Sequence, residues 1–282
     1  MRLVSFERDG KSGFGAVSGD GVVDLTPRFA GRASGLRGLL SAGLLDEARE
    51  AASGPATQAL DGLHLLPVIP DPDKIICVGL NYRDHVAETG RTVTEKPALF
   101  ARYAGSQVGH GQPLVRPRVS EQFDYEGELA VVIGTGGRHI APEEALRHVG
   151  GYACYNEGSV RDWQRHTSQF LAGKTFAGTG GFGPWLVTAD EIPDPSKLIL
   201  ETRLNGQVVQ HTTTDLMITP VPQLIAYIST ILPLLPGDVI VSGTPGGVGM
   251  KREPPLFMRP GDVAEVEISG IGTLRNPVIA EE

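Results

Sequence analysis

Three acidic residues at alternate positions mark the segment of the chain with the clearest potential for chemistry. Asp124, Glu126 and Glu128 lie in residues 123–134, whose second half is an apolar run. In an extended strand alternate side chains share a face, so we expect these carboxylates to project together from a strand that continues into a buried sheet. A hard divalent cation such as Mg²⁺, Mn²⁺ or Ca²⁺ would relieve their mutual repulsion. The alternative is a solvated acidic strand end.

His85 and Glu88 form a second candidate site. If Asn81 is the N-cap of a helix, the two side chains are one turn apart and lie on one face. A carboxylate beside an imidazole raises its basicity and orients it, as in sites that activate water. The alternative is an exposed histidine and a Glu88 that pairs with Arg91.

Residues 152–164 form a third candidate site, which begins as a strand and ends as a polar, helical segment. Glu157 could supply a further oxygen ligand. Arg161 and Gln164 could contact carboxylate or carbonyl oxygens of a substrate. The alternative for Arg161 is an ordinary structural salt bridge.

Two glycine-rich segments complete the set of candidates. Lys174 precedes residues 178–185 and could reach into a site as a point charge, although the spacing of a Walker loop is absent. Residues 242–249, which include Thr244, follow an apolar strand, and their glycines would let the backbone approach a ligand closely. The sequence also lacks the motifs of serine-nucleophile hydrolases, zinc sites and dinucleotide-binding folds.

Composition indicates an ordinary globular protein. Of its 282 residues 40% are hydrophobic and 21% charged, and 37 glycines and 21 prolines favour a fold rich in strands and turns. A net charge of −8 argues against nucleic acid as a partner. No apolar run approaches the ~20 residues of a membrane span, and no signal peptide is evident, so we expect no membrane association and a cytoplasmic location. Cys77 and Cys154 are expected to be small core residues.

Residues 1–66 are predicted to form a small N-terminal α+β module. Short strands are expected at residues 3–6, 13–17 and 22–25, and Gly38 and Gly43 are expected to split a helical pattern over residues 36–52. The proline-rich residues 67–72 mark the boundary to a larger domain, residues 67–282.

The larger domain is predicted to be α+β as well. A hairpin over residues 198–213 has Asn205-Gly206 at its tip, and residues 222–232 have the spacing of a buried helix. Two Pro-Gly-Asp segments, residues 236–241 and 260–266, are expected to be strands that pair in one sheet. Strands outnumber helices without regular alternation, which excludes a doubly wound or barrel α/β fold.

Together these segments resemble the fumarylacetoacetate hydrolase family over roughly residues 72–280, because separate motifs occur in the family's order. Residues 79–82 with His85 and Glu88 resemble the lid segment of the family. Residues 97–100 with Ser106 resemble the strand and loop that follow, residues 124–129 the metal strand, and residues 242–245 the ligand-facing loop.

The resemblance implies a role for each candidate residue. It makes Glu126, Glu128 and Glu157 the metal ligands, with Glu157 where the family usually carries aspartate. Asp124 is a ligand in some relatives only. The implied catalytic residues are His85, Glu88 and Lys174, and the implied substrate-binding residues are Tyr82, Arg161, Gln164 and Thr244.

The resemblance also implies rolled, layered β-structure with few helices, a homodimer, and Mg²⁺ as cofactor, with Mn²⁺ or Ca²⁺ possible. The implied reaction is hydrolysis of a C–C bond in a 2,4-diketo acid, either an acylpyruvate or a diketo-deoxy sugar acid, through a metal-bound enolate. The alternative is an isomerase or decarboxylase of a 2-oxo or 2-hydroxydienoate acid in aromatic catabolism. A non-catalytic binding protein for oxo acids is a further, weaker alternative. His85 with Glu88 favours hydrolysis, because decarboxylation needs no water-activating pair.

Overall fold

Two sheets enclose the core that positions the candidate site. The computed structural model describes residues 1–282 of the chain. The strands of the twelve-stranded sheet are β1 (Arg2–Arg8), β2 (Lys11–Ser18), β3 (Gly21–Asp24), β4 (Gln58–Ala59), β5 (His64–Leu65), β6 (Ile75–Gly79), β7 (Ala98–Arg102), β8 (Gln107–Val108), β11 (Gly127–Ile133), β12 (Val149–Glu157), β14 (Gly180–Thr188) and β17 (Val239–Val241). Their main path runs β4-β3-β2-β1-β14-β12-β11-β17-β6-β7.

A second sheet of five strands packs against the first, in the order β16-β15-β18-β19-β9. Its strands are β9 (Leu114–Arg116), β15 (Ile199–Leu204), β16 (Gln207–Thr213), β18 (Val263–Ile268) and β19 (Gly272–Ala280), and a separate pair joins β10 (Phe123–Asp124) to β13 (Ser159–Val160). The helices are α1 (Leu36–Ser41), α2 (Leu45–Ala51), α3 (Arg83–Thr89), α4 (Arg161–Gln164), α5 (Leu171–Lys174) and α6 (Val221–Ile231). Mixed sheets with six short helices confirm the α+β prediction.

Strand β11 is buried on both faces, and this fixes its place at the centre of the large sheet. Leu129, Val131 and Ile133 pack in one core cluster with residues of the second sheet and α6. Ala130 and Val132 face the other cluster, which includes residues of the N-terminal segment. Polar and apolar residues therefore do not alternate along β11, as expected for a strand whose sheet is covered on both faces.

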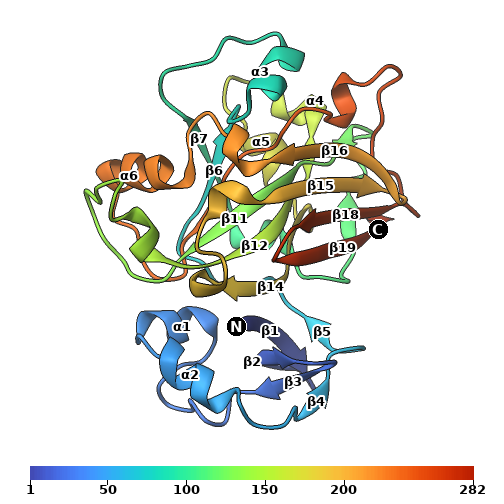
Figure 1. Ribbon diagram of the computed structural model, residues 1–282. Helices are drawn as coiled ribbons and strands as arrows, with labels where there is room; N and C mark the ends of the chain where they lie inside the picture. Colours follow the sequence, from blue (N-terminus) through green and yellow to red (C-terminus); the bar gives the residue numbers. More distant parts are fainter.

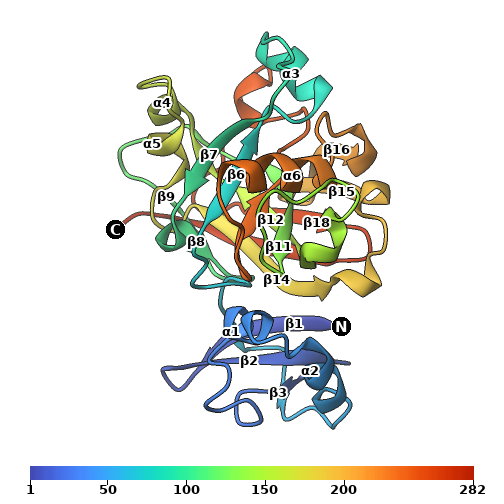
Figure 2. The ribbon, with the colours of Figure 1, turned by 90° about the vertical axis from the view of Figure 1, so that its left-hand side faces the viewer.

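The N-terminal residues form a distinct region at one end of the molecule, and α3 lies at the opposite end (Figures 1 and 2). The predicted strands and the split into α1 and α2 are confirmed. Strand β1 also pairs with β14, through Arg2 with Val187 and Leu3 with Leu186, so the large sheet runs through both parts of the chain. The boundary between residues 1–66 and 67–282 stays a prediction.

In the larger domain the structure confirms the predicted hairpin and helix but not the predicted pairing of the Pro-Gly-Asp strands. The hairpin of β15 and β16 is confirmed, with Asn205 and Gly206 at φ 54° and 77° in its turn. Helix α6 is confirmed too. The expected pairing of the two Pro-Gly-Asp strands is wrong, because β17 lies between β11 and β6 whereas β18 lies between β15 and β19. Their similar sequences reflect similar turns, not a shared sheet.

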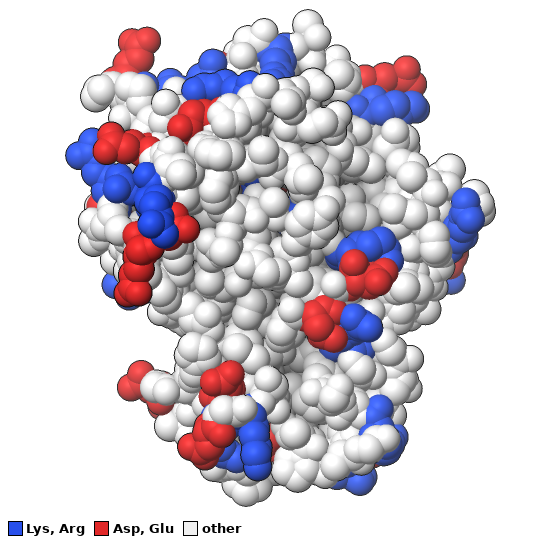
Figure 3. Space-filling model, turned by 180° about the vertical axis from the view of Figure 1, so that it is seen from behind, with Lys and Arg blue, Asp and Glu red and all other residues white.

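On one face of the molecule, charged groups are dispersed. On the face shown in Figure 3, basic and acidic side chains lie in mixed groups separated by large uncharged areas. No helix combines the length and the apolar character that crossing a membrane requires.

Gly127 provides a test of how closely the two sheets pack. A Cβ atom on Gly127 would lie 2.0 Å from Oγ1 of the buried Thr202 on β15. We expect Gly127→Ala to lower the free energy of unfolding by roughly 1–3 kcal/mol, because the sheets would have to separate. Chemical denaturation measures the change. Gly105→Ala is the matched control, since its Cβ meets open space, and equal stability of the two variants would contradict the close packing.

Candidate active site

Three buried glutamates converge where β11 begins and β12 ends. Carboxylate oxygens of Glu126, Glu128 and Glu157 lie within 4.8 Å of one another, and the three residues are 3%, 1% and 1% exposed. The antiparallel pairing of Gly127 with Asn156 brings these positions together across the two strands. The structure thus unites the three residues that the sequence singled out as metal ligands.

The oxygen atoms of this glutamate triad fit a divalent cation. Oε1 of Glu157 is buried without a hydrogen-bond partner, and the Nη1 atom of Arg102 lies 3.8 Å from it, too far to donate. Burial, together with the charges of Glu157 and Glu126, raises the pKa of Glu128 well above its usual range. A cation bound by the triad would satisfy the orphaned oxygen and favour the ionised form of Glu128.

Asp124 is not part of the triad, and the expectation of one continuous acidic strand is wrong. Regular pairing breaks at residues 125 and 126, so Asp124 lies in β10 and Glu128 in β11. The Asp124 carboxylate instead accepts hydrogen bonds from Nε of Arg161 at 2.8 Å and from the backbone N–H groups of Gly249 and Met250. Asp124 therefore anchors an arginine and the loop beside the site.

Lys174 and Arg161 neutralise part of the triad. Nζ of Lys174 donates to Glu126 at 2.5 Å and to Glu157 at 3.0 Å. Arg161 contacts Glu126 at 2.8 Å and donates from Nη1 to the side chain of Gln164 at 3.0 Å. Burial alone would raise the pKa of Glu126, but Lys174 and Arg161 outweigh burial and lower it to about 2. The position of Arg161 is compatible both with a structural salt bridge and with a contact to substrate, since it pairs with Asp124 and Glu126 and also borders the cavity.

Arg102 is a buried cation of the site that the sequence did not reveal. Its guanidinium donates to Oγ of Ser106, to the carbonyl of Gly158 and to Oγ1 of Thr179, all of them buried partners. Its Nη1 atom lies 3.8 Å from Oε1 of Glu157, so its positive charge adjoins that carboxylate. Its only signal in the sequence is a lone arginine at the end of an otherwise apolar strand.

His85 and Glu88 form a pair, as predicted, but their helix does not begin where it was predicted to begin. Nδ1 of His85 lies 2.7 Å from Oε1 of Glu88, and the N–H of Gly247 donates to the other oxygen of Glu88. Helix α3 begins at Arg83, and its N-terminus has no side-chain cap. The prediction that Asn81 is the cap is wrong, because its amide bonds the backbone of Thr219 and Ser242 instead.

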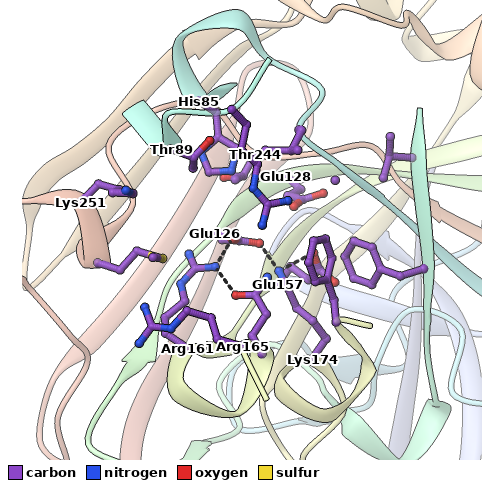
Figure 4. Close-up of a pocket in the computed structure, with 18 of the residues that line it drawn as sticks. His85, Thr89, Glu126, Glu128, Glu157, Arg161, Arg165, Lys174, Thr244 and Lys251 are labelled. Carbon is purple, nitrogen blue, oxygen red and sulfur yellow. Dashed lines mark hydrogen bonds and ion pairs between the residues drawn. The ribbon is translucent and has the colours of Figure 1, made fainter. Parts of the chain in front are cut away.

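One cavity of about 620 Å³ unites these groups. In Figure 4, His85 and Thr244 lie on one side of the triad, and Arg161 and Lys174 on the other. The predicted site residues that line it are His85, Glu126, Glu128, Glu157, Arg161, Gln164, Lys174 and Thr244. Glu88 lies behind His85, outside the lining.

Tyr82 is not brought to the cavity. It is 0% exposed within the core cluster beneath α6, and burial raises the pKa of its phenol well above the usual range. The structure gives no support to its predicted contact with substrate.

Comparison with known proteins places this geometry in a family. Residues 74–279 match the family model for the fumarylacetoacetate (FAA) hydrolase C-terminal domain. The chain belongs to the fumarylacetoacetate hydrolase family. It is therefore related to enzymes, and its buried triad lies in a fold for which a manganese complex is known.

Three similar proteins of this family illustrate its range. Oxaloacetate tautomerase fahd2, mitochondrial, of Xenopus laevis is 39% identical over 99% of this chain and 90% of its own. The structure of a fumarylacetoacetate hydrolase from Exiguobacterium antarcticum has a TM-score of 0.87 at 38% identity, with both chains fully covered. The structure of maleylpyruvate hydrolase from Sphingobium sp. SYK-6 with manganese(II) and pyruvate has a TM-score of 0.84 at 28% identity, also over the full length of both.

Metal binding is expected to depend on the triad. We predict that Glu128→Ala abolishes Mn²⁺ and Mg²⁺ binding measured by calorimetry, because only two carboxylates would remain for the ion. Glu143→Ala, on an exposed residue outside the cavity, is the control and should bind as the unchanged protein does. Undiminished titration of Glu128→Ala would remove Glu128 from the ligand set.

Arg102 is expected to be essential for stability. Arg102→Leu should lower the free energy of unfolding by about 3–5 kcal/mol, since it strips three buried acceptors of their donor and removes the positive charge beside buried Glu157. Arg118→Leu removes an exposed pair with Glu281 and should cost less than about 1 kcal/mol. Equally small changes in chemical denaturation would show that Arg102 contributes no more than a surface charge.

Proposed function

We propose that this protein is a divalent-metal-dependent enzyme that shifts a proton on a small 2-oxo acid, as in keto–enol tautomerisation. One observation carries the proposal: the imidazole of His85 borders the same cavity as the buried glutamate triad and Lys174. The tautomerase relative, similar over almost the whole chain, supports isomerisation as the first choice, whereas the sequence alone favoured hydrolysis.

Glu126, Glu128 and Glu157 would hold the ion, and we propose Mg²⁺, with Mn²⁺ or Ca²⁺ as alternatives. Such an ion would act as a Lewis acid that stabilises negative charge developing on the 2-oxo oxygen of the acid. Arg161, Gln164 and Thr244 line the cavity and would orient the substrate oxygens. Lys174, held between Glu126 and Glu157, would add positive charge beside the reacting oxygen.

His85 would move the proton. Its Nδ1 atom is engaged by Glu88, which favours the tautomer whose Nε2 atom is free to act as base. The C3–H bond of the acid breaks, its proton passes to Nε2, and its electron pair moves into the C2–C3 double bond as the 2-oxo oxygen gains charge. That oxygen then takes the proton from Nε2, which completes the enol and restores neutral His85.

Hydrolysis of a C–C bond in a 2,4-diketo acid is the second candidate. The same His85 could take a proton from water, and the maleylpyruvate hydrolase that contains manganese and pyruvate supports this chemistry in the fold. Decarboxylation breaks a C–C bond without removal of a C3 proton, so His85 would have no role as a base in the bond-breaking step. A non-catalytic binding protein would leave His85 and Glu88 without a role in the cavity. A homodimer and a cytoplasmic location both stay predictions.

A panel of 2-oxo and 2,4-diketo acids with Mg²⁺ in D₂O separates these reactions by product mass. Tautomerisation exchanges C3 hydrogen for deuterium, hydrolysis adds water, and decarboxylation loses carbon dioxide. We expect C3 exchange above the rate without enzyme. Loss of carbon dioxide or addition of water as the faster reaction would overturn the first choice.

His85→Ala should lower the exchange rate by about 10²–10⁴-fold, because the proton loses its base. Binding of oxalate to the metal-loaded variant, measured by calorimetry, should persist. His139→Ala, on an exposed histidine outside the cavity, serves as control. Full turnover by His85→Ala would reject the assigned role.

A further inference from the structure

A second cavity lies where the N-terminal region meets the rest of the molecule, and it shares no lining residue with the candidate active site. Its volume is about 760 Å³, within the range of roughly 300–1,000 Å³ that small-molecule sites occupy. Asp20 and residues 60–65 line it from the N-terminal region, and residues 110–113, 184–185 and 273 line it from the larger part. Strand β1 pairs with both β5 and β14, which lie at this boundary (Figure 1).

Apolar side chains form one part of the lining. Leu60, Leu63 and Trp185 are half-buried and pack beside the buried Leu65. The indole N–H of Trp185 donates to the carbonyl of Ile271 at 2.6 Å, so the ring is held in place and has no polar group left for a ligand. This part of the cavity can therefore hold the apolar body of a ligand.

Two imidazoles line the cavity, and each retains an N–H group without a partner in the protein. Nε2 of Gln112 donates to the carbonyl of Leu65 and to Nε2 of His64, so His64 carries its proton on Nδ1. Nδ1 of His110 accepts from the backbone N–H of Arg275 at 3.1 Å, which leaves its proton on Nε2. Burial lowers the pKa of His110, so this ring stays uncharged at neutral pH. Both rings can therefore donate to an uncharged oxygen of a ligand.

The carboxylates of this cavity have no basic counterpart in its lining. Asp20 and Asp61 are exposed, neither side chain forms an ion pair, and no lysine or arginine lines the cavity. Arg2 and Arg275 lie nearby, the first over the indole at 5.1 Å and the second paired with Glu265, but neither belongs to the lining. A positively charged ligand is therefore complementary to this cavity, whereas an anionic oxo acid is repelled.

A metal ion is not the cation that fits. Over residues 1–282, the glutamate triad is the one group of three or more His, Cys, Asp or Glu residues whose ligand atoms lie within 4.8 Å of one another. The two aspartates and two histidines of the second cavity do not converge in this way. His110 also presents a proton on Nε2, where a metal would need a lone pair. A larger, organic cation can contact groups that are spread over the lining.

We infer that this second cavity binds a small organic cation, a protonated amine on an aromatic or apolar body, with its ammonium group at Asp20 and Asp61. The apolar body packs on Leu60, Leu63 and Trp185, and an uncharged oxygen accepts from the imidazoles. Because both parts of the chain line the cavity, the ligand bridges them. The site is independent of the proposed function, since its lining and its charge preference are different.

Three phenols of similar shape test the inference: tyramine, a cation; tyrosol, its neutral alcohol counterpart; and 3-(4-hydroxyphenyl)propionate, an anion. Calorimetry with the Mg²⁺-loaded protein gives a dissociation constant for each. We expect tyramine to bind about three- to twentyfold more tightly than tyrosol, because each exposed carboxylate contributes up to about fivefold, and the anion to bind most weakly. The double variant Asp20→Asn, Asp61→Asn should lose this preference. Asp9→Asn, on an exposed turn of the same region outside the cavity, should retain it.

The two tryptophans of the chain report where tyramine binds. Trp185 lines the second cavity, whereas Trp163 belongs to α4, which carries two residues of the candidate active site. The indole N–H resonances, assigned with Trp163→Phe, can be followed by NMR during the titration. We expect tyramine to shift the resonance of Trp185 and to leave that of Trp163 in place.

Four results would each overturn the inference. They are equal dissociation constants for tyramine and tyrosol, a preference for tyramine that survives in the double variant, a larger shift of Trp163 than of Trp185, and no binding of tyramine at about 10 mM, well above the weak affinity of an exposed site. None of these results bears on the proton shift, which is measured by deuterium exchange.

Discussion

The structure depends on basic side chains that offset the negative charge of three carboxylates buried at one point. Removing each of them from water costs several kcal/mol, and their mutual repulsion adds to that cost. Lys174 and Arg161 contact Glu126 directly, and Arg102 adjoins Glu157. Even so, one oxygen of Glu157 has no partner. The three basic residues thus offset much of the negative charge, and the unpaired oxygen fits a bound cation.

The sheet architecture gives this cluster its rigidity. Strands β11 and β12 are buried throughout, and each presents glutamate only where regular pairing begins or ends. Side chains at such positions are held by neighbours on both faces, which limits the motion of the three carboxylates. Helix α3 is held differently, since its Asp84 and Glu88 accept hydrogen bonds from the N–H groups of Gly246 and Gly247. Helix α3 is therefore attached to the glycine-rich loop through backbone donors.

Much of the fold could be predicted from local patterns. The hairpin of β15 and β16, helix α6 and the split between α1 and α2 follow from turn residues and periodicity, which act over a few positions. Period-two spacing also placed Glu126 and Glu128 together. It failed at Asp124, because an irregular backbone at residues 125 and 126 interrupts the strand, and no residue there signals the break.

Other features of the site could not be predicted because they depend on contacts distant in sequence. Arg102 is recognisable only once its partners Gly158 and Thr179 are adjacent. The role of Asn81 likewise depends on Thr219 and Ser242, which are distant in sequence. Hydrogen bonds to their carbonyls override the preference of asparagine for a helix cap. Tyr82 lies close in sequence to His85 yet faces the core.

The central claim is that the glutamate triad binds one divalent ion that receives a 2-oxo acid. Crystals grown with Mn²⁺ and oxalate, measured at the manganese absorption edge, test it most directly. We expect a single anomalous peak bounded by Glu126, Glu128 and Glu157, with one oxygen from each carboxylate of oxalate bound to the ion. A strong peak elsewhere, or no peak in the cavity at saturating Mn²⁺, would contradict the claim.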